Sequence, residues 1–358
     1  MKRIIVMLGC VFLISGQTFA GNPDRSGEAG AAELNMNGWG NSSGLWSMNS
    51  ANIMGIESER VNPAGLAFTQ KTEIEASYAL WLQGSGVGVA HAGFAQNVKD
   101  NVIGISIQAL NLGSIERTTT NNPEGGVGSY SPAFVNIGLS YARKFSNSIS
   151  GGVTVRIIDE GLGNLNAFGA CIDGGLQYVT GPKDNIHFGV SLRNIGTPMK
   201  FTGDALSTSV NIVSTSTYTL TEVSNVNKFE LPTQLNIGAA YDIWMGAKKE
   251  VTPKVFVQDY RLTALANFTS NAFGYDYYGV GLEFGWKKML MLRAAWRFEK
   301  GQFNEATRLD VYTGLAAGAT FDVPLKKGGG GPHLAIDYSF RTTSPFQGTH
   351  SFGLRVDL

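Results

Sequence analysis

Apolar and polar residues alternate one by one through most of this chain, from about residue 72 to the last residue. Between 103 and 109, one face carries Ile103, Ile105, Ile107 and Ala109, and the other carries Gly104, Ser106 and Gln108. A period of two is typical of a β-strand whose two faces meet different environments. Helical periodicity is almost absent, so the pattern predicts an all-β protein.

Fourteen segments with this pattern are predicted as strands: 72–82, 86–96, 101–113, 133–144, 149–157, 167–179, 185–195, 234–246, 252–262, 275–286, 289–299, 309–323, 333–343 and 349–358. Many reach about ten residues, which crosses a bilayer when tilted, whereas strands of soluble proteins average about five or six. Aromatic residues such as Tyr141, Tyr241 and Trp286 stand at strand ends, as in interfacial girdles. We therefore predict a transmembrane antiparallel β-barrel of about fourteen strands.

Charged residues occur in the middle of several predicted strands, on the polar face: Arg156, Arg193, Glu283, Arg293, Arg297, Asp337 and Arg341. The packed core of a sandwich would not tolerate them, but the hydrated lumen of a barrel would. Ion pairs of Arg293 or Arg297 with Glu283 would stabilise the interior, which is the simpler interpretation. A permeation path lined by the same side chains is the alternative.

Short connections between the predicted strands alternate with long ones. Tight turns are expected at 97–100, 146–148 and 181–184, and long loops at 114–132, 196–233, 263–274 and 300–308. Residues 217–220 are a candidate for an additional short hairpin. The four glycines at 328–331 lack the Lys-Ser/Thr of a phosphate loop and indicate a flexible connection. Outer-membrane barrels have this asymmetry, with the long loops outside the cell.

The first residues have the order of a secretory signal peptide. Lys2 and Arg3 precede an apolar run at 4–14, and Ala20 ends the segment as a small residue, so cleavage after Ala20 is predicted. The run is too short for a membrane anchor. The chain therefore divides into a signal peptide (1–20), an N-terminal segment (21–71) and the barrel (72–358).

The N-terminal segment, residues 21–71, is rich in Gly, Asn and Ser and shows no sustained alternation. Such a segment either extends into the periplasm or folds into the lumen as a plug. Trp39 and Trp46 favour folding inward, because large apolar side chains are stabilised by burial.

Composition and spacing argue against several kinds of chemistry. The 28 basic and 28 acidic side chains give no net charge for binding nucleic acid. His91, His187, His333 and His350 fall on four different strands without the spacing of a metal site, and no nucleophile elbow is present. Asp337 and His350, on the last two strands, are expected to form a cross-strand polar pair in the lumen. We assign no catalytic, cofactor-binding or metal-binding residue and expect a protein that is not an enzyme.

The stretch Val61-Asn62-Pro63-Ala64-Gly65-Leu66-Ala67 resembles a motif of FadL-type barrels, especially of the PorV/PorQ family. Residues 336–341 and 349–354, within the last two predicted strands, resemble the closing hairpin of that family. By itself Asn62-Pro63 predicts a turn, because Pro63 fixes φ and Gly65 permits a bend. The resemblance implies that Asn62, Pro63 and Gly65 anchor a plug in the lumen. The chain departs from the family pattern at residues 48–52 and at its C-terminal Leu358.

Two functions follow from this resemblance, both in the cell outer membrane. The first is that of a non-enzymatic component of a type IX secretion machinery, which would bind exported proteins and other secretion components through loops 114–132 and 196–233. The alternative is a FadL-like transporter of hydrophobic small molecules, with a lipid or another hydrophobic ligand held where residues 36–56 meet the barrel wall. An outer-membrane hydrolase is the third hypothesis and would need a Ser/His/acid cluster near a rim. We expect the protein to contact the lipid bilayer and not to bind nucleic acid.

Overall fold

The computed structural model describes residues 21–358 except 214–216, 247–248, 253–254, 258, 288, 307 and 327–330. The predicted signal peptide lies outside the described residues, as do residues 328–330 of the predicted flexible connection. None of the helices within the described ranges is long and apolar enough to span a membrane.

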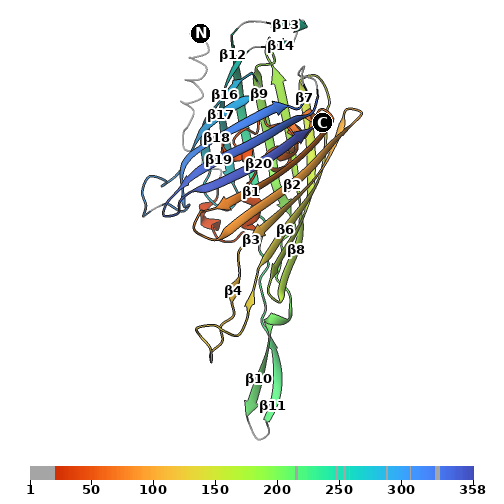
Figure 1. The fold of residues 1–358 in the computed structure, drawn as a ribbon. Helices are drawn as coiled ribbons and strands as arrows, with labels where there is room; N and C mark the ends of the chain where they lie inside the picture. Colours follow the sequence, from red (N-terminus) through yellow and green to blue (C-terminus); the bar gives the residue numbers. More distant parts are fainter. Residues whose placement is uncertain are drawn as a thin grey trace.

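Fourteen antiparallel strands form one closed barrel (Figure 1). In order around the barrel they are β1 (Thr72–Trp81), β2 (Val87–Val98), β3 (Asn101–Asn111), β6 (Ala133–Lys144), β7 (Ile149–Leu162), β8 (Leu165–Thr180), β9 (Ile186–Gly196), β12 (Gln234–Met245), β15 (Tyr260–Asn271), β16 (Tyr277–Trp286), β17 (Leu290–Glu299), β18 (Tyr312–Pro324), β19 (His333–Thr343) and β20 (Thr349–Asp357). The first strand closes the barrel against the last, from the pair Glu73–Asp357 to the pair Leu80–His350. The predicted fold class and strand number are confirmed.

Burial alternates along each strand as the sequence pattern predicts. In β3, for example, Ile103, Ile105 and Ile107 face outward and are about half exposed, while Ser106 and Gln108 are buried inside. An apolar exterior and a polar interior are the reverse of a soluble barrel and are typical of outer-membrane barrels. Aromatic side chains gather on the outside at one end, among them Tyr141, Tyr178, Tyr241, Tyr260 and Trp286.

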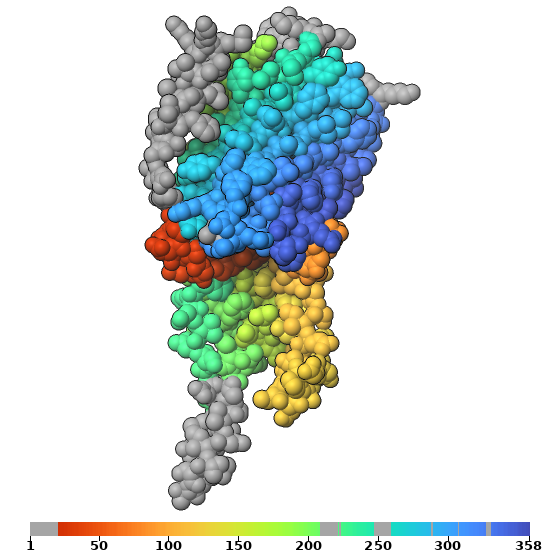
Figure 2. All heavy atoms as spheres, turned by 90° about the vertical axis from the view of Figure 1, so that its left-hand side faces the viewer, coloured from red at the N-terminus to blue at the C-terminus, as the bar shows by residue number. Residues whose placement is uncertain are grey.

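The two ends of the barrel differ. At the short-turn end, Lys99 and Asp100 alone join β2 to β3, and both have positive φ. At the long-loop end, two hairpins extend beyond the barrel: β4 (Ile115–Glu116) with β5 (Ser129–Tyr130), and β10 (Ser207–Val213) with β11 (Thr217–Val223) (Figure 1). The additional hairpin expected around 217–220 is thus confirmed. The wall on the side of β3 to β9 reaches further than the wall of β15 to β20 (Figure 2).

One predicted strand was wrong. Residues 252–262 do not form a barrel strand, and the expected loop 263–274 is mostly β15. Instead β13 (Lys249–Thr252) pairs with β14 (Val255–Val257) as a small separate sheet. The valines at 251, 255 and 257 have the apolar pattern of a membrane strand, which led to the wrong prediction. The inward face of β15 is mostly polar, with Thr263, Asn267 and Thr269 buried, so this strand has the composition of a loop. β7 and β8 are also longer than predicted, because only Gly163 and Asn164 separate them.

The N-terminal segment lies inside the barrel and fills the middle of the lumen. It contains five short helices: η1 (Pro23–Arg25), η2 (Ala32–Asn35), α2 (Gly40–Ser43), η3 (Ile56–Arg60) and η4 (Pro63–Phe68). α2 packs against β18, β19 and β20, while η4 packs against β6, β7 and β8 on the opposite wall. Its first residues reach the surface at the rim of the shorter wall, as the red atoms in Figure 2 show. The core of the molecule therefore lies between this segment and the barrel wall.

Candidate functional site: a lumen divided into two chambers

The Asn62-Pro63 turn fixes the N-terminal segment to the wall. Asn62 caps η4, where its Oδ1 accepts a hydrogen bond from the amide of Ala64. Its Nδ2 donates to the carbonyl of Ser50 at 2.7 Å and to that of Leu176 on β8 at 3.0 Å. One fully buried side chain thus joins three pieces of backbone.

Glycines make room for this turn. A Cβ on Gly175 of β8 would lie 2.0 Å from Asn62 Oδ1, and one on Gly152 of β7 would lie 2.3 Å from the carbonyl oxygen of Pro63. Within the turn, a Cβ on Gly65 would lie 2.2 Å from the carbonyl oxygen of Ile53. Only glycine allows backbone to approach this closely, so wall and turn are complementary in shape.

The predicted lumen charges Arg156 and Arg193 lie together near this turn. Arg156 donates to Asp173 at 3.0 Å and lies 3.7 Å from Glu59 of the N-terminal segment. Asp173 also accepts the amide of Asn194 at 2.6 Å, where the pairing of β8 with β9 shifts register. Arg193 donates to the carbonyl of Leu34 at 3.1 Å. Buried charges thus tie the segment to the wall at an irregularity of the sheet.

Arg60 is buried in the same region without an ion pair within 4.0 Å among the described residues. It donates to the carbonyls of Glu33 and Met36. Burial lowers its pKa well below the ordinary value, and the positive charges of Arg156 and Arg193 lower it further.

Glu283, Arg293 and Asp337 form a second group on the opposite wall. Arg293 donates through Nε to Glu283 at 2.6 Å and through Nη1 to Thr320 at 2.6 Å. Thr320 in turn donates to Asp337, and Arg261 pairs with Glu283 from the other side. Arg297, the other candidate partner of Glu283, instead pairs with Glu299 and Asp310. These contacts stabilise the interior of the wall.

Asp337 and His350 do not form the expected polar pair. Strand register places Asp337 opposite Gly353 and His350 opposite Phe340. Successive side chains of a strand point to opposite faces, so Asp337 is buried inside and His350 bonds to Tyr338 on the outside, at 2.9 Å. The expectation was wrong because His350 is three residues from Gly353, the partner of Asp337, and an odd number of residues places the two side chains on opposite faces.

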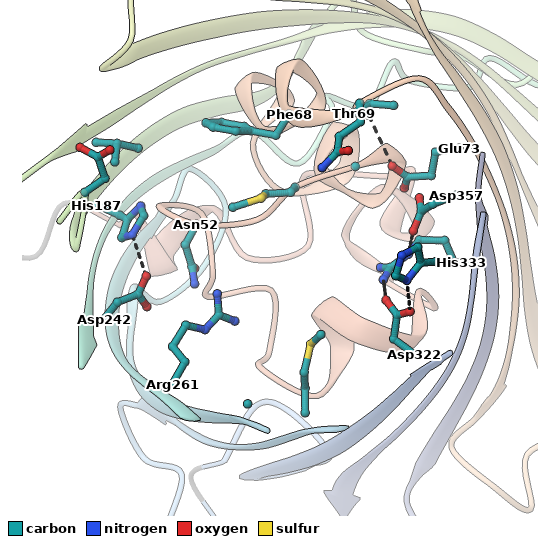
Figure 3. Close-up of a pocket in the computed structure, with 18 of the residues that line it drawn as sticks. Asn52, Phe68, Thr69, Glu73, His187, Asp242, Arg261, Asp322, His333 and Asp357 are labelled. Carbon is teal, nitrogen blue, oxygen red and sulfur yellow. Dashed lines mark hydrogen bonds and ion pairs between the residues drawn. The ribbon is translucent and has the colours of Figure 1, made fainter. Parts of the chain in front are cut away.

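A chamber of about 850 Å³ opens at the short-turn end. Two histidine–aspartate pairs lie on opposite sides of it (Figure 3): His187 Nε2 is 3.0 Å from Asp242 Oδ2, and His333 Nδ1 is 2.9 Å from Asp322 Oδ1. Figure 3 also shows the N-terminal segment crossing the barrel behind them. Within the described part of the chain, no group of three or more His, Cys, Asp or Glu residues could hold a metal ion.

A second chamber, of about 680 Å³, lies at the long-loop end. Its lining combines aromatic rings with arginines: Trp46, Trp81, Phe273, Tyr275, Tyr277, Tyr312, Arg193, Arg297 and Arg341. The N-terminal segment contributes Trp46 and lies between this chamber and the other one. Sequence reasoning identified Arg297 and Arg341 but missed the rings around them, because Trp46, Trp81 and Tyr312 are far apart in the chain.

The rings and guanidinium groups in this chamber are stacked on one another. The guanidinium carbon of Arg297 lies 4.5 Å from the centre of the Trp46 ring, and that of Arg341 lies 4.7 Å from Trp81 and 5.3 Å from Trp46. Tyr312 meets Trp46 edge-on at 4.9 Å. These are cation–π and edge-to-face geometries, so the chamber has flat walls with positive charge between them.

Comparison with known proteins shows that solved structures have a similar fold. No family model matches the chain, and no curated protein sequence matches it significantly. Among solved structures, the Pseudomonas putida toluene transporter TodX has a TM-score of 0.54 at 13% identity, covering 89% of this chain and 96% of its own. The Ralstonia pickettii toluene transporter TbuX has a TM-score of 0.51 at 10% identity, covering 89% and 96%.

A Pseudomonas aeruginosa FadL homologue is also similar, with a TM-score of 0.50 at 10% identity over 89% of this chain and 97% of its own. At these identities the likeness concerns the fold. The chain thus has the fold of FadL-type outer-membrane barrels.

Proposed function

We propose that this protein is a non-enzymatic outer-membrane channel that admits small, mainly apolar molecules of the size of an aromatic ring. The observation that carries the proposal is the course of the N-terminal segment, which crosses the lumen between an aromatic-lined chamber at one end and a second chamber at the other. The apolar exterior of the barrel supports its insertion in lipid. TodX and TbuX are named as transporters of toluene, which is a molecule of this kind.

The test is uptake by cells that have an intact outer membrane and lack other channels of this fold. Expression of the full chain is expected to raise the initial uptake rate of radiolabelled toluene above that of the empty vector. Ala32 is exposed and lines the long-loop chamber. Ala32→Trp should narrow the chamber and lower uptake towards the vector level.

The matched control is Ala133→Trp, since Ala133 is also exposed near the long-loop end but does not line the chamber. It should leave uptake unchanged. Uptake equal to that of the vector with the native chain, correctly inserted, would disprove the channel. Equal uptake by native and Ala32→Trp cells would show that molecules take another route.

A second candidate is a docking role in protein secretion of the type IX kind. It is favoured by the β10–β11 hairpin, which extends far beyond the barrel wall (Figure 1). Replacing residues 207–223 by a short Gly-Ser linker should abolish co-purification of exported proteins and other secretion components from mild detergent. Co-purification that survives this replacement, or that never occurs with the native chain, would contradict docking through this hairpin.

A further inference from the structure

We propose that the long-loop chamber binds an aromatic carboxylate, with the carboxylate on Arg341 and the ring against the aromatic walls. This inference rests on the proposed channel function, because it names the class of molecule that the channel takes up. It differs from a channel for plain hydrocarbons in requiring an acidic group on the ligand.

Arg341 is a buried cation without an ion pair among the described residues. Its side chain donates to the carbonyl of Asn37 at 2.7 Å, and its Nε has no hydrogen-bond partner among the described residues. No carboxylate within the described part of the chain lies within 4.0 Å of it. A buried, unpaired charge costs free energy. A ligand oxyanion would offset that cost through charge-assisted hydrogen bonds.

The neighbouring Arg297, unlike Arg341, has ion-pair partners. Arg297 is neutralised by Asp310 and by Glu299 at 3.4 Å. Arg193, which also lines the chamber, has no ion pair within 4.0 Å among the described residues. Among the residues that line the chamber, three arginines therefore face two carboxylates, and Arg341 and Arg193, on opposite walls, are the two without an ion pair.

The aromatic walls select a flat ligand over a sugar or a flexible chain. Both Arg297 and Arg341 stack on Trp46, so this ring is not open for stacking a sugar. Trp81 is only partly buried and, with Tyr312, flanks the guanidinium of Arg341. An aromatic carboxylate can place its ring beside them and its oxygens at the edge of the guanidinium.

The site is held in place before any ligand arrives. Trp46 has φ of +56° and Ser47 has φ of +57°, a conformation that non-glycine residues adopt only where surrounding contacts impose it. The indole nitrogen of Trp46 donates to the carbonyl of Gly314 at 2.8 Å. A neutral hydrocarbon would fill the same space but would leave Arg341 unpaired, and buried unpaired groups are what make such sites selective.

Calorimetric titration of the purified, full-length mature barrel in detergent tests the inference with four probes: benzoate, benzamide, toluene and octanoate. Benzoate is expected to bind at least tenfold more tightly than benzamide, which has the same shape without the charge, and more tightly than toluene or octanoate. High salt should weaken benzoate binding more than toluene binding.

Arg341→Gln should remove the preference for benzoate over benzamide, and Arg341→Lys should reduce it, because lysine keeps the charge but lacks the planar fork. Arg308→Gln is the matched control. Arg308 is partly buried and donates to the carbonyl of Ser344 at 3.2 Å, but it does not line the chamber. The Arg308→Gln variant should bind all four probes with the affinities of the native chain.

Equal affinities for benzoate and benzamide in the native chain would overturn the inference, whether or not the variants fold. Octanoate binding as tight as benzoate would overturn its aromatic part. Toluene uptake by cells without benzoate binding would reject the inference and keep the channel. Benzoate binding without uptake of any probe would keep the site and reject the channel.

Discussion

At the scale of single residues, the Asn62 side chain concentrates the contacts between the N-terminal segment and the wall. Asn62→Ala would remove the hydrogen bonds to the carbonyls of Ser50 and Leu176 and the cap of η4. Leaving buried carbonyls unpaired costs about 1–3 kcal/mol. We expect a loss of unfolding free energy of that order in detergent, measured by denaturant titration.

The exposed Asn111 provides the control for this substitution. Asn111→Ala at the long-loop end removes a bond to the amide of Gly113, which is close to solvent. Its unfolding free energy should change by no more than about 0.5 kcal/mol. Similar losses for the two variants would show that Asn62 has no special role.

Glu57 of η3 makes the stability depend on pH. Burial raises the pKa of this carboxyl to about 7, and the nearby Asp337 carboxylate contributes to the shift, while a hydrogen bond from the amide of Ser42 and the charge of Arg355 oppose it. The pKa of Glu57 in the unfolded chain is lower, at about 4.5, so the contribution of this group to stability is complete below about pH 4.5. It is lost as the pH rises through about 7.

Denaturant unfolding at pH 5, 6, 7 and 8 checks this prediction. The native chain should lose free energy of unfolding as the pH rises, by up to about 3 kcal/mol from this group. Glu57→Gln cannot ionise and should show a smaller decrease. An identical decrease in both chains would mean that other groups cause it.

At the scale of elements, the two-residue turn between β2 and β3 carries backbone strain. Lys99 and Asp100 have φ of +52° and +68°, which suits the Asn-Gly sequence preferred in such hairpin turns. Lys99→Asn with Asp100→Gly should raise the free energy of unfolding by about 1 kcal/mol. Asp100→Val, with a β-branched residue at positive φ, should lower it, and a gain with Val would refute the turn assignment.

The strands themselves could largely be predicted from the sequence, because lipid on one side and a polar lumen on the other impose strict alternation. β15 shows where this fails. Its inward Thr263, Asn267 and Thr269 and its small outward Ala264 and Ala266 resemble a loop in composition. The nearby valines of β13 and β14 offered a stronger but misleading pattern.

The chambers could be predicted only in part. Alternation identified Arg297 and Arg341 as inward residues, yet it could not place Trp46 between them. The N-terminal segment has no periodicity, and its path is decided by contacts between distant residues, such as Trp46 with Gly314. Register also decides which inward groups meet, as Asp337 and His350 show.

At the scale of the whole molecule, the segment and the barrel form one packed unit. Glu59 accepts hydrogen bonds from Ser140 and Ser106 and lies beside Arg156, so charges of the segment complete those of the wall. Removing one member of such a buried group costs more than removing all of it. The proposed channel would therefore open by a rearrangement of the segment while the wall stays closed.

The path of the N-terminal segment also limits the order in which the protein can fold. The segment starts at the long-loop end, where the amide of Gly21 lies 2.7 Å from Asp276, and leaves at the short-turn end to begin β1. It therefore passes through the bore from end to end. A finished barrel has no side entrance for it, so the segment either enters through the mouth at the short-turn end or is enclosed before the seam between β1 and β20 closes. In the second order, the hydrogen bonds between β1 and β20 would be the last of the sheet to form and would trap the segment.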